Sequence, residues 1–165
     1  NMTTPDPNGT LCGTSTCLVQ TGEGRVRGLE LEGRATLPWD MAVIFTGTRS
    51  AAKVTESNTQ SQIGNYLPQA PKWMASLFLD QRIRHGALAG MGIGGGVRYT
   101  GHSYGDTANT LSIPGYTLFD VFLRYDFETA HPRYKCLSFS VNARNIADKR
   151  FVATCTAAPA CYYGP

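Results

Sequence analysis

Glycines in the stretch GALAGMGIGGGVRYTG, residues 86–101, have the spacing of a phosphate-binding motif. Gly90, Gly92 and Gly95 match G-x-G-x-x-G, which cradles a dinucleotide when it opens a helix whose N–H groups meet the pyrophosphate. The following residues, VRYTGHSYGDTANT, have no helical periodicity and are rich in turn formers. The glycines alternate with apolar residues instead, so the pattern predicts a β-strand and argues against a nucleotide site.

Three other residues have the types needed for hydrolytic chemistry. His102, Ser103 and Asp106 could serve as base, nucleophile and orienting group. They lie in one turn-rich segment, without the flanking elements that position such a triad. His85 and His131 stand alone in turn segments and provide no metal-ligand set. The sequence predicts no catalytic residue, no metal site and no enzymatic activity.

The five cysteines form two close pairs and one singleton. Cys12 and Cys17 bracket GTST, and Cys155 and Cys161 bracket TAAPA, both in loop-like sequence. This spacing predicts two small disulfide loops and an oxidising compartment. A zinc site is the alternative, but it would usually need closer spacing and further partners. Cys136 is expected to be a free, partly buried thiol at the start of a strand.

Charge and hydropathy exclude several classes of protein. Charged residues are 16% of the 165 residues, below the roughly 25% usual in soluble domains. The net charge is +3 and the basic residues form no run, so no nucleic-acid partner is expected. No apolar run approaches the roughly 18 residues of a membrane-spanning helix. The first residues, NMTTPDPNGT, lack the basic and apolar segments of a signal peptide.

Apolar and polar residues alternate with a period of two in six segments, which predicts six strands and no helix. The segments are 27–37, 39–48, 72–80, 89–99, 116–128 and 136–145. In the fourth, one face is nearly bare because Gly92, Gly94 and Gly96 occupy it. Two explanations are open: the glycines clear space in a polar lumen, or they relieve crowding where the strand coils strongly.

Short and long connections alternate along the chain. Short turns are expected near 37–38, 84–87 and 128–134, and long loops near 55–71, 102–113 and from 148 onward. Outer-membrane barrels have short periplasmic turns, long extracellular loops, apolar-out alternation and aromatic girdles. The aromatic residues near strand ends are Trp39, Trp73, Tyr99, Tyr116 and Tyr125, and we expect Tyr99 and Tyr116 to be girdle residues. Six strands cannot close a barrel, so the fold class expected is all-β, an antiparallel meander forming part of a larger barrel.

Four separated segments carry family motifs in a fixed order. They are TGEGRVRGLELEGRATLPWD (G-x-x-R-x-x-G-x-E), YLPQAPKWMASLFLD (G-x-x-L-x-x-x-P-x-H), VRYTGHSYGDTANTLSIPGYTLFDVFLRYDF (G-x-R-Y-x-G … P-x-Y-x-x-x-D) and SVNARNIADKRFVATCTAAPACYYG (N-x-x-N-L-x-D-K-x-Y-x-x-x-C). The chain from about Gln20 onward thereby resembles the TonB-dependent ferric siderophore receptors, most of all the ferrichrome type.

The resemblance implies a barrel of about 22 strands with a plugged lumen in a Gram-negative outer membrane. Residues 1–165 would be one C-terminal segment of that barrel, with the plug and the last strand outside this chain. The complete receptor would act as a monomer surrounded by outer-membrane lipid. It would bind a ferric siderophore, contact TonB through the plug region, and carry iron only as the siderophore complex, without a cofactor.

The resemblance also implies a ligand site made by loops and the upper barrel wall. Its candidate residues are Tyr66, Arg98, Tyr104, Tyr116, Thr156, Tyr162 and Tyr163. Thr156 stands where ferrichrome-type receptors have an aromatic residue, Phe151 where the family usually has tyrosine, and Trp73 where it usually has histidine. These departures argue against ferrichrome itself as the substrate, and Cys155–Cys161 would rigidify the last loop.

The charged residues on the polar faces have a structural interpretation that we favour for most of them, namely salt bridges across the lumen wall. They are Arg34, Arg98, Arg124, Arg144, Glu30, Glu32, Asp120 and Asp126. The alternatives to a siderophore receptor are a passive outer-membrane pore or adhesin-like barrel, and a small secreted β-sandwich.

Overall fold

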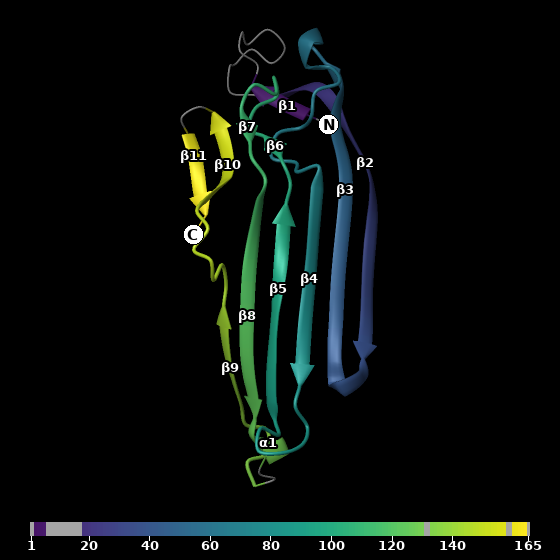
Figure 1. Cartoon of the computed structure of the whole chain (residues 1–165). Helices are drawn as coiled ribbons and strands as arrows, with labels where there is room; N and C mark the ends of the chain where they lie inside the picture. Colours follow the sequence, from purple (N-terminus) through teal and green to yellow (C-terminus); the bar gives the residue numbers. More distant parts are fainter. Residues whose placement is uncertain (1, 6–17, 131–132, 158–159, 165) are drawn as a thin grey trace.

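The computed structural model describes residues 2–5, 18–130, 133–157 and 160–164, and side chains for 22–129, 133–155 and 160–164. Its main feature is one antiparallel sheet of seven strands in the order β1-β2-β3-β4-β5-β8-β9 (Figure 1). The strands are β1 (Met2–Pro5), β2 (Leu18–Leu37), β3 (Met41–Ser57), β4 (Trp73–Arg82), β5 (Met91–Thr100), β8 (Tyr116–Asp126) and β9 (Ser138–Ala143). The six predicted strands correspond to β2, β3, β4, β5, β8 and β9, which confirms the antiparallel meander.

Two smaller ribbons lie at one end of the sheet. β6 (Ser103–Tyr104) pairs with β7 (Ser112–Ile113), and β10 (Phe151–Ala157) pairs with β11 (Ala160–Gly164). The long loop predicted from 148 onward contains a hairpin, because this segment folds back on itself. Short and long connections do alternate as predicted, and the long ones gather at the upper end in Figure 1.

The expectation of no helix needs a small correction. Single turns occur as η1 (Pro38–Asp40), η2 (Gln60–Gln62) and α1 (Phe127–Ala130). At α1 the Glu128 N–H donates to Asp126 Oδ1 at 3.0 Å, which is a capping interaction that favours a helical turn. No helix in the described part of the chain is long and apolar enough to cross a membrane.

β2 and β3 are longer than a membrane requires. They have 20 and 17 residues, against about 9–11 for a strand that crosses a bilayer. Their upper parts continue past the rest of the sheet, where β1 pairs with β2 and the 64–67 segment bonds to β3. There Leu67 packs on Gly24, and Ala52 and Val54 are buried. The surplus length therefore supports the loops.

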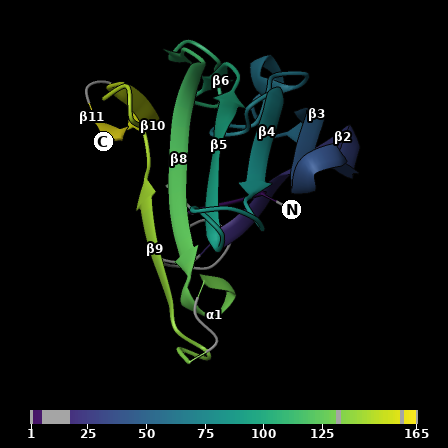
Figure 2. The same cartoon turned by 60° about the horizontal axis from the view of Figure 1, so that its bottom comes forward.

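The strand register separates an apolar face from a polar face. Directly opposed residues share a face, and Phe45, Leu77, Val97 and Phe119 form one continuous row across β3, β4, β5 and β8. Its neighbours Leu29, Leu31, Leu79, Ile93, Val121, Leu123, Phe139 and Val141 are all exposed. We call this the apolar face. The sheet that bears it curves and does not close among the described strands (Figure 2).

The glycines of β5 are explained by the side chains of the neighbouring strands. On the polar face, a Cβ at Gly94 would overlap the Phe122 ring of β8, and one at Gly96 would overlap the Phe78 ring of β4. At Gly92 a Cβ would lie 2.6 Å from Arg124 Nε. Aromatic rings and a guanidinium of the adjacent strands thus fill the space that the glycines clear on the polar face.

Candidate functional site

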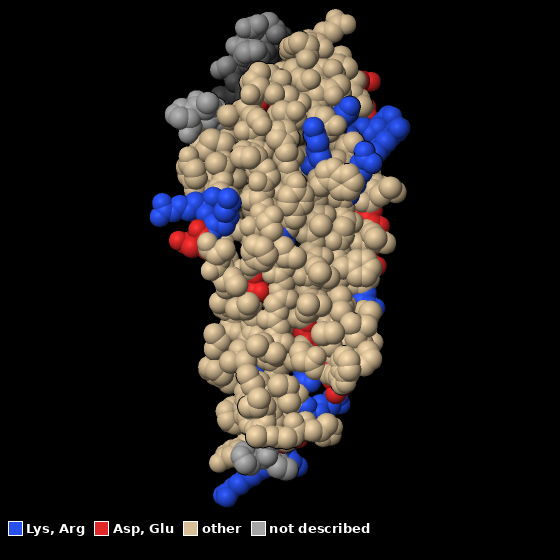
Figure 3. Space-filling model, viewed as in Figure 1, with Lys and Arg blue, Asp and Glu red and all other residues tan. Residues whose placement is uncertain are grey.

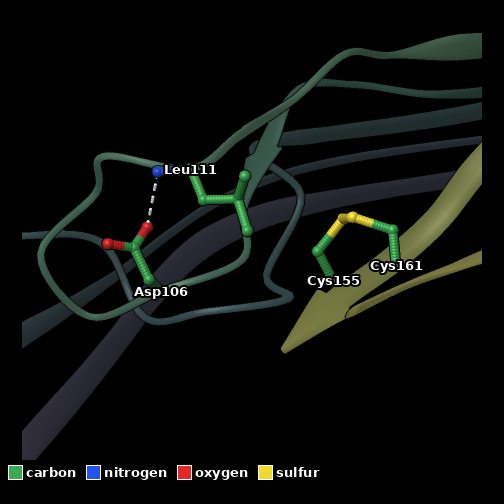
Figure 4. Close-up of a disulfide and its surroundings, with 4 residues drawn as sticks. All are labelled: Asp106, Leu111, Cys155 and Cys161. Carbon is green, nitrogen blue, oxygen red and sulfur yellow. Dashed lines mark hydrogen bonds between the residues drawn. A yellow bond between two sulfur atoms is a disulfide. The ribbon is translucent and has the colours of Figure 1, made fainter. Parts of the chain in front are cut away.

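The β10–β11 hairpin is closed by a disulfide and rests on the preceding loop (Figure 4). Cys155 and Cys161 are bonded at an S–S distance of 2.01 Å, and Cys155 is buried. Gly105 of the 101–115 loop lies so close that a Cβ there would be 2.9 Å from the Cys155 carbonyl oxygen. Cys12 and Cys17 lie outside the described residues. Cys136 is free as expected, but it is exposed and precedes β9.

The Asp106 carboxylate organises the tip of the 101–115 loop (Figure 4). It accepts hydrogen bonds from Leu111 N at 2.7 Å, Thr110 N at 3.1 Å and Thr110 Oγ1 at 2.7 Å. The Leu111 N–H, followed by the Thr110 hydroxyl, lowers the pKa of Asp106 from its usual value. The carboxylate is therefore occupied by the loop's own donors.

His102, Ser103 and Asp106, the possible hydrolase triad of the sequence analysis, do not form a catalytic arrangement. His102 Nε2 lies 2.8 Å from Ser112 Oγ, Ser103 is buried, and Asp106 bonds to Thr110 and Leu111. Within the described ranges, no group of three or more His, Cys, Asp or Glu side chains lies together in a way that could hold a metal ion.

Asn109 joins the two long loops, a role that the sequence analysis missed. Its Nδ2 donates to Tyr66 O at 2.8 Å, and its Oδ1 accepts from Tyr66 N at 2.7 Å. Nearby, Asn65 Nδ2 donates to Thr107 O at 3.0 Å. Asn109 has φ 59°, a conformation that asparagine tolerates better than most residues. An asparagine in a turn-rich segment was the only available signal.

Two of the predicted ligand residues, Tyr66 and Tyr104, are brought together. Their rings stack with centroids 6.1 Å apart, and Lys72 Nζ lies 3.9 Å from the Tyr66 centroid and 5.2 Å from that of Tyr104. Tyr66 pairs with Lys53, which shares the apolar-face side of β3 with Arg49. This pairing turns Tyr66 away from the polar face.

A second aromatic group forms beside the hairpin. Tyr116 stacks on Phe151 with centroids 3.9 Å apart. They line a shallow pocket of about 290 Å³, together with Lys149, Arg150 and Tyr163. Tyr116 is opposite Thr100 on the polar face, so its assignment to the girdle was wrong. Tyr116 and Asp120 are four residues apart in one strand, so alternation alone predicts that they share the polar face.

Tyr162 and Tyr163, which were also predicted as ligand residues, lie in the β10–β11 hairpin. The structure records no interaction between them and Tyr66 or Tyr104. Tyr162 and Tyr163 are 63% and 74% exposed, which is unusual for large aromatic side chains. Thr156 belongs to β10, but its side chain is not among those described.

Arg98 is engaged in a bidentate ion pair. Arg98 Nε and Nη2 donate to Asp120 at 2.6 and 3.0 Å, and Asp120 Oδ1 also accepts from Asn145 N at 3.0 Å. Asn145 in turn bonds to Lys149 through both its side-chain atoms, at 2.9 and 3.1 Å. The polar face is thereby linked to the turn that leads into β10.

The prediction of salt bridges on the polar face is confirmed in part. Besides Arg98–Asp120, Arg124 pairs with Asp80 of β4 at 2.9 Å, a partner not anticipated from the sequence. The structure records no ion pair, as far as it describes the chain, for Arg34, Arg144, Glu30, Glu32 or Asp126.

Comparisons with known proteins agree with this architecture. Residues 1–146 match the family described as TonB dependent receptor-like, beta-barrel. The chain is 38% identical over 146 residues to the ferrichrome outer membrane transporter/phage receptor of Escherichia coli K12, covering 88% of this chain and 19% of that protein. It is 36% identical over 150 residues to the ferrioxamine receptor of Yersinia enterocolitica, covering 91% and 20%.

A solved structure shows the same fold. The ferric preacinetobactin receptor BauA of Acinetobacter baumannii superposes with a TM-score of 0.75 at 22% identity, covering 99% of this chain and 23% of that chain. The chain spans about a fifth of the length of the curated relatives it matches. With the family match extending over residues 1–146, the chain belongs to the TonB-dependent receptor family, whose β-barrels lie in the outer membrane of Gram-negative bacteria.

Proposed function

We propose that the protein containing this chain is an outer-membrane receptor that imports a ferric siderophore with energy delivered through TonB. The relatives at 38% and 36% identity are named for ferrichrome and ferrioxamine. The observation that carries the proposal is the aromatic pocket at the loop end of the sheet, formed around the Tyr116–Phe151 stack. TonB would act through a plug region, and the complete receptor would work as a monomer around its own lumen.

We propose that the polar-face side of the loop end supplies this chain's part of the binding site. Tyr116 and Tyr163 line the pocket, and exposed Tyr162 and β10 residue Thr156 belong to the same hairpin. Tyr104 stacks on Tyr66 and shares Lys72 with it, so it lies with Tyr66 and outside the group around Tyr116. Arg98 supports the site through Asp120 and Asn145, and Tyr66 lies too far toward the apolar-face side to contribute directly.

We propose no covalent step for this chain. Ser103 is buried and the Asp106 carboxylate is occupied by Leu111 and Thr110, so these two residues do not form an activated nucleophile in the described part of the loop end. Iron would pass as its siderophore complex, and the siderophore recovered after uptake should be chemically unchanged by the receptor.

The test is uptake of radioactive iron presented as a panel of ferric siderophores. Cells that lack other receptors would express the complete receptor, either wild-type or Tyr116→Ala. Removing an aromatic anchor should weaken binding of the transported siderophore by about tenfold, equivalent to about 1.4 kcal/mol. Tyr99→Ala is the matched control, because Tyr99 lies at a similar height on the apolar face.

The same assay separates the receptor from a passive pore. Uptake should stop in cells that lack TonB and resume when TonB is restored. Uptake that continues without TonB would favour the pore, and a Tyr116→Ala receptor with unchanged affinity would remove the pocket from the binding site.

A further inference from the structure

The walls of the pocket beside the β10–β11 hairpin carry positive charge. Besides the Tyr116–Phe151 stack, Lys149 and Arg150 line the pocket, and no described Asp or Glu does so. Among the described ion pairs, none includes Lys149 or Arg150. Cations without a partner at the wall of a pocket favour an anionic occupant.

The acidic residues on the polar face and in the nearby chain do not cancel this charge. Asp120 accepts hydrogen bonds from Arg98 at 2.6 and 3.0 Å, so its carboxylate is already neutralised. Asp148 is adjacent to the two cations in the chain, but it forms no ion pair within the described residues and does not line the pocket. Glu30 and Glu32 lie on β2, which β3, β4 and β5 separate from β8. The pocket therefore keeps a surplus of positive charge.

The positive charge continues along the polar face. Arg144, which has no ion pair among the described residues, lines a second pocket of about 340 Å³ together with the Arg98–Asp120 pair. This second pocket lies farther from the loop end, because Asp120 follows Tyr116 along β8. At the height of the β9–β10 connection, a group of Lys and Arg side chains projects from the edge of the molecule in Figure 3, with acidic atoms beside it. Like charges along one wall attract an anion and speed its association.

Hydrogen bonds to the sheet fix the backbone that carries the pocket's cations. Asn145 Oδ1 accepts from Lys149 N at 2.9 Å, and Asn145 Nδ2 donates to Lys149 O at 3.1 Å. The Asn145 N–H in turn donates to Asp120 Oδ1 of β8 at 3.0 Å. Because this backbone is fixed before a ligand arrives, less conformational entropy is lost on binding. The cations are therefore held beside the Tyr116–Phe151 stack.

The size and the aromatic rings of the pocket favour a flat group. Tyr116 and Phe151 stack with their ring centroids 3.9 Å apart, and the hydroxyl of Tyr163 in the same pocket can donate a hydrogen bond. The volume of about 290 Å³ is at the lower limit of pockets that enclose a whole drug-sized ligand, which start at about 300 Å³. The pocket therefore fits one chelating arm of a siderophore, with an aromatic ring against the stack and anionic oxygens toward Lys149 and Arg150.

We propose that this pocket makes the receptor selective for ferric siderophores whose chelating groups are both aromatic and anionic, as catecholates are. This selectivity depends on the receptor function proposed above, and it assigns a substrate class to the same pocket. A ferric tris-catecholate complex is an anion with aromatic rings at its surface, whereas a ferric tris-hydroxamate complex is neutral and its chelating groups have no ring. Charge-assisted hydrogen bonds from lysine and arginine therefore favour the catecholate complex.

The experiment measures binding of radioactive ferric complexes to the purified complete receptor. A tris-catecholate and a tris-hydroxamate complex are compared in wild type and in the pocket variant, Lys149→Gln combined with Arg150→Gln. The matched control is Arg133→Gln combined with Lys135→Gln, which removes the same charge near the start of β9, away from the loop end. Wild type and control should bind the catecholate complex about tenfold more tightly than the hydroxamate complex, and the pocket variant should lose most of this preference.

Two measurements on wild type alone do not depend on how well the variant folds. Added salt should weaken binding of the catecholate complex and leave the neutral hydroxamate complex nearly unchanged. An anionic ferric citrate complex, which has no aromatic ring, should bind more weakly than the catecholate complex. Salt-independent catecholate binding, or binding of citrate or hydroxamate as tight as that of catecholate, overturns the proposal. Equal catecholate binding by the pocket variant and the control also overturns it.

Failure of the selectivity can be distinguished from failure of the receptor function. TonB-dependent uptake of the hydroxamate complex without preference for the catecholate complex would support a siderophore receptor and overturn the assigned substrate class. Absence of TonB-dependent uptake for every ferric siderophore in the panel would overturn the receptor function itself.

Discussion

At the scale of single residues, Asp120 connects the spanning sheet with the loop-end hairpin. It holds Arg98 of β5 and the backbone of Asn145, which precedes β10. In a double-mutant cycle with Asp120→Asn and Arg98→Gln, we expect a coupling energy of about 1 kcal/mol in the unfolding of the complete receptor. Urea titration measures it; additive effects of the two changes would show that the ion pair does not contribute.

Asp106 predicts an acid-sensitive loop. Because its pKa is lowered in the folded loop, its stabilising contribution is present above the unfolded value of about 3.9 and is lost as pH falls through the folded value. Cleavage of the 105–111 loop by an acid-tolerant protease should therefore stay constant from neutral pH to about 4 and rise only below it. In Asp106→Asn the loop should be cleaved faster at neutral pH and show no acid step.

Residue types alone identified some site residues and missed others. The position of Tyr116 on the polar face could be counted from Asp120, since alternation in a strand is strict. The roles of Asn109 and Asn145 could not be predicted, because each depends on contact with a distant loop or strand. Local sequence encodes which face a strand residue takes, whereas loop-to-loop hydrogen bonds depend on how the strands bring the loops together.

At the scale of elements, β9 offers a direct test of the two faces. Val141 is opposite Leu123 on the apolar face, and its neighbour Asn142 is opposite Phe122 on the polar face. Arginine facing lipid costs about 2–4 kcal/mol at the bilayer midplane and less toward the interfaces, so Val141→Arg should destabilise the complete receptor by about 1–2 kcal/mol. Asn142→Arg should cost well under 1 kcal/mol. Similar losses in both variants would contradict the assignment of the faces.

The glycines of β5 predict a compensating pair of mutations. In Gly96→Ala the new methyl group meets the Phe78 ring, and overpacking of this kind costs about 1–3 kcal/mol. Adding Phe78→Ala should recover part of the loss, because the ring that clashes is removed. Unfolding free energies of the two single variants and the double variant measure this; a double variant as unstable as the sum would reject the ring contact.

The sequence predicted strands best where lipid imposes a strict alternation. The strand lengths expected from the sequence were too short for β2 and β3, since their upper halves pair with β1 and with residues 64–67, beyond the residues that define the apolar face. The β10–β11 hairpin was missed because TAAPA has neither alternation nor a strong turn signal, and the disulfide supplies the constraint instead. Alternation of apolar and polar residues indicates whether lipid or water contacts each face of a strand. It does not predict structure that a crosslink or a neighbouring loop determines.

At the scale of the whole molecule, the sheet has open edges that membranes do not tolerate. The part of β2 that follows the segment paired with β1 is hydrogen-bonded only to β3 among the described strands. In the same way, β9 is hydrogen-bonded only to β8. Each unpaired N–H or C=O in hydrocarbon costs several kcal/mol, so these 165 residues alone should not insert as a monomer. Refolded with lipid vesicles, they should remain protease-sensitive or associate edge to edge into cross-linkable oligomers. The complete receptor, treated identically, should give a protected monomer, because its other strands pair with both edges. A protected monomer from the 165 residues would mean that the edges close on each other, contrary to the strand order.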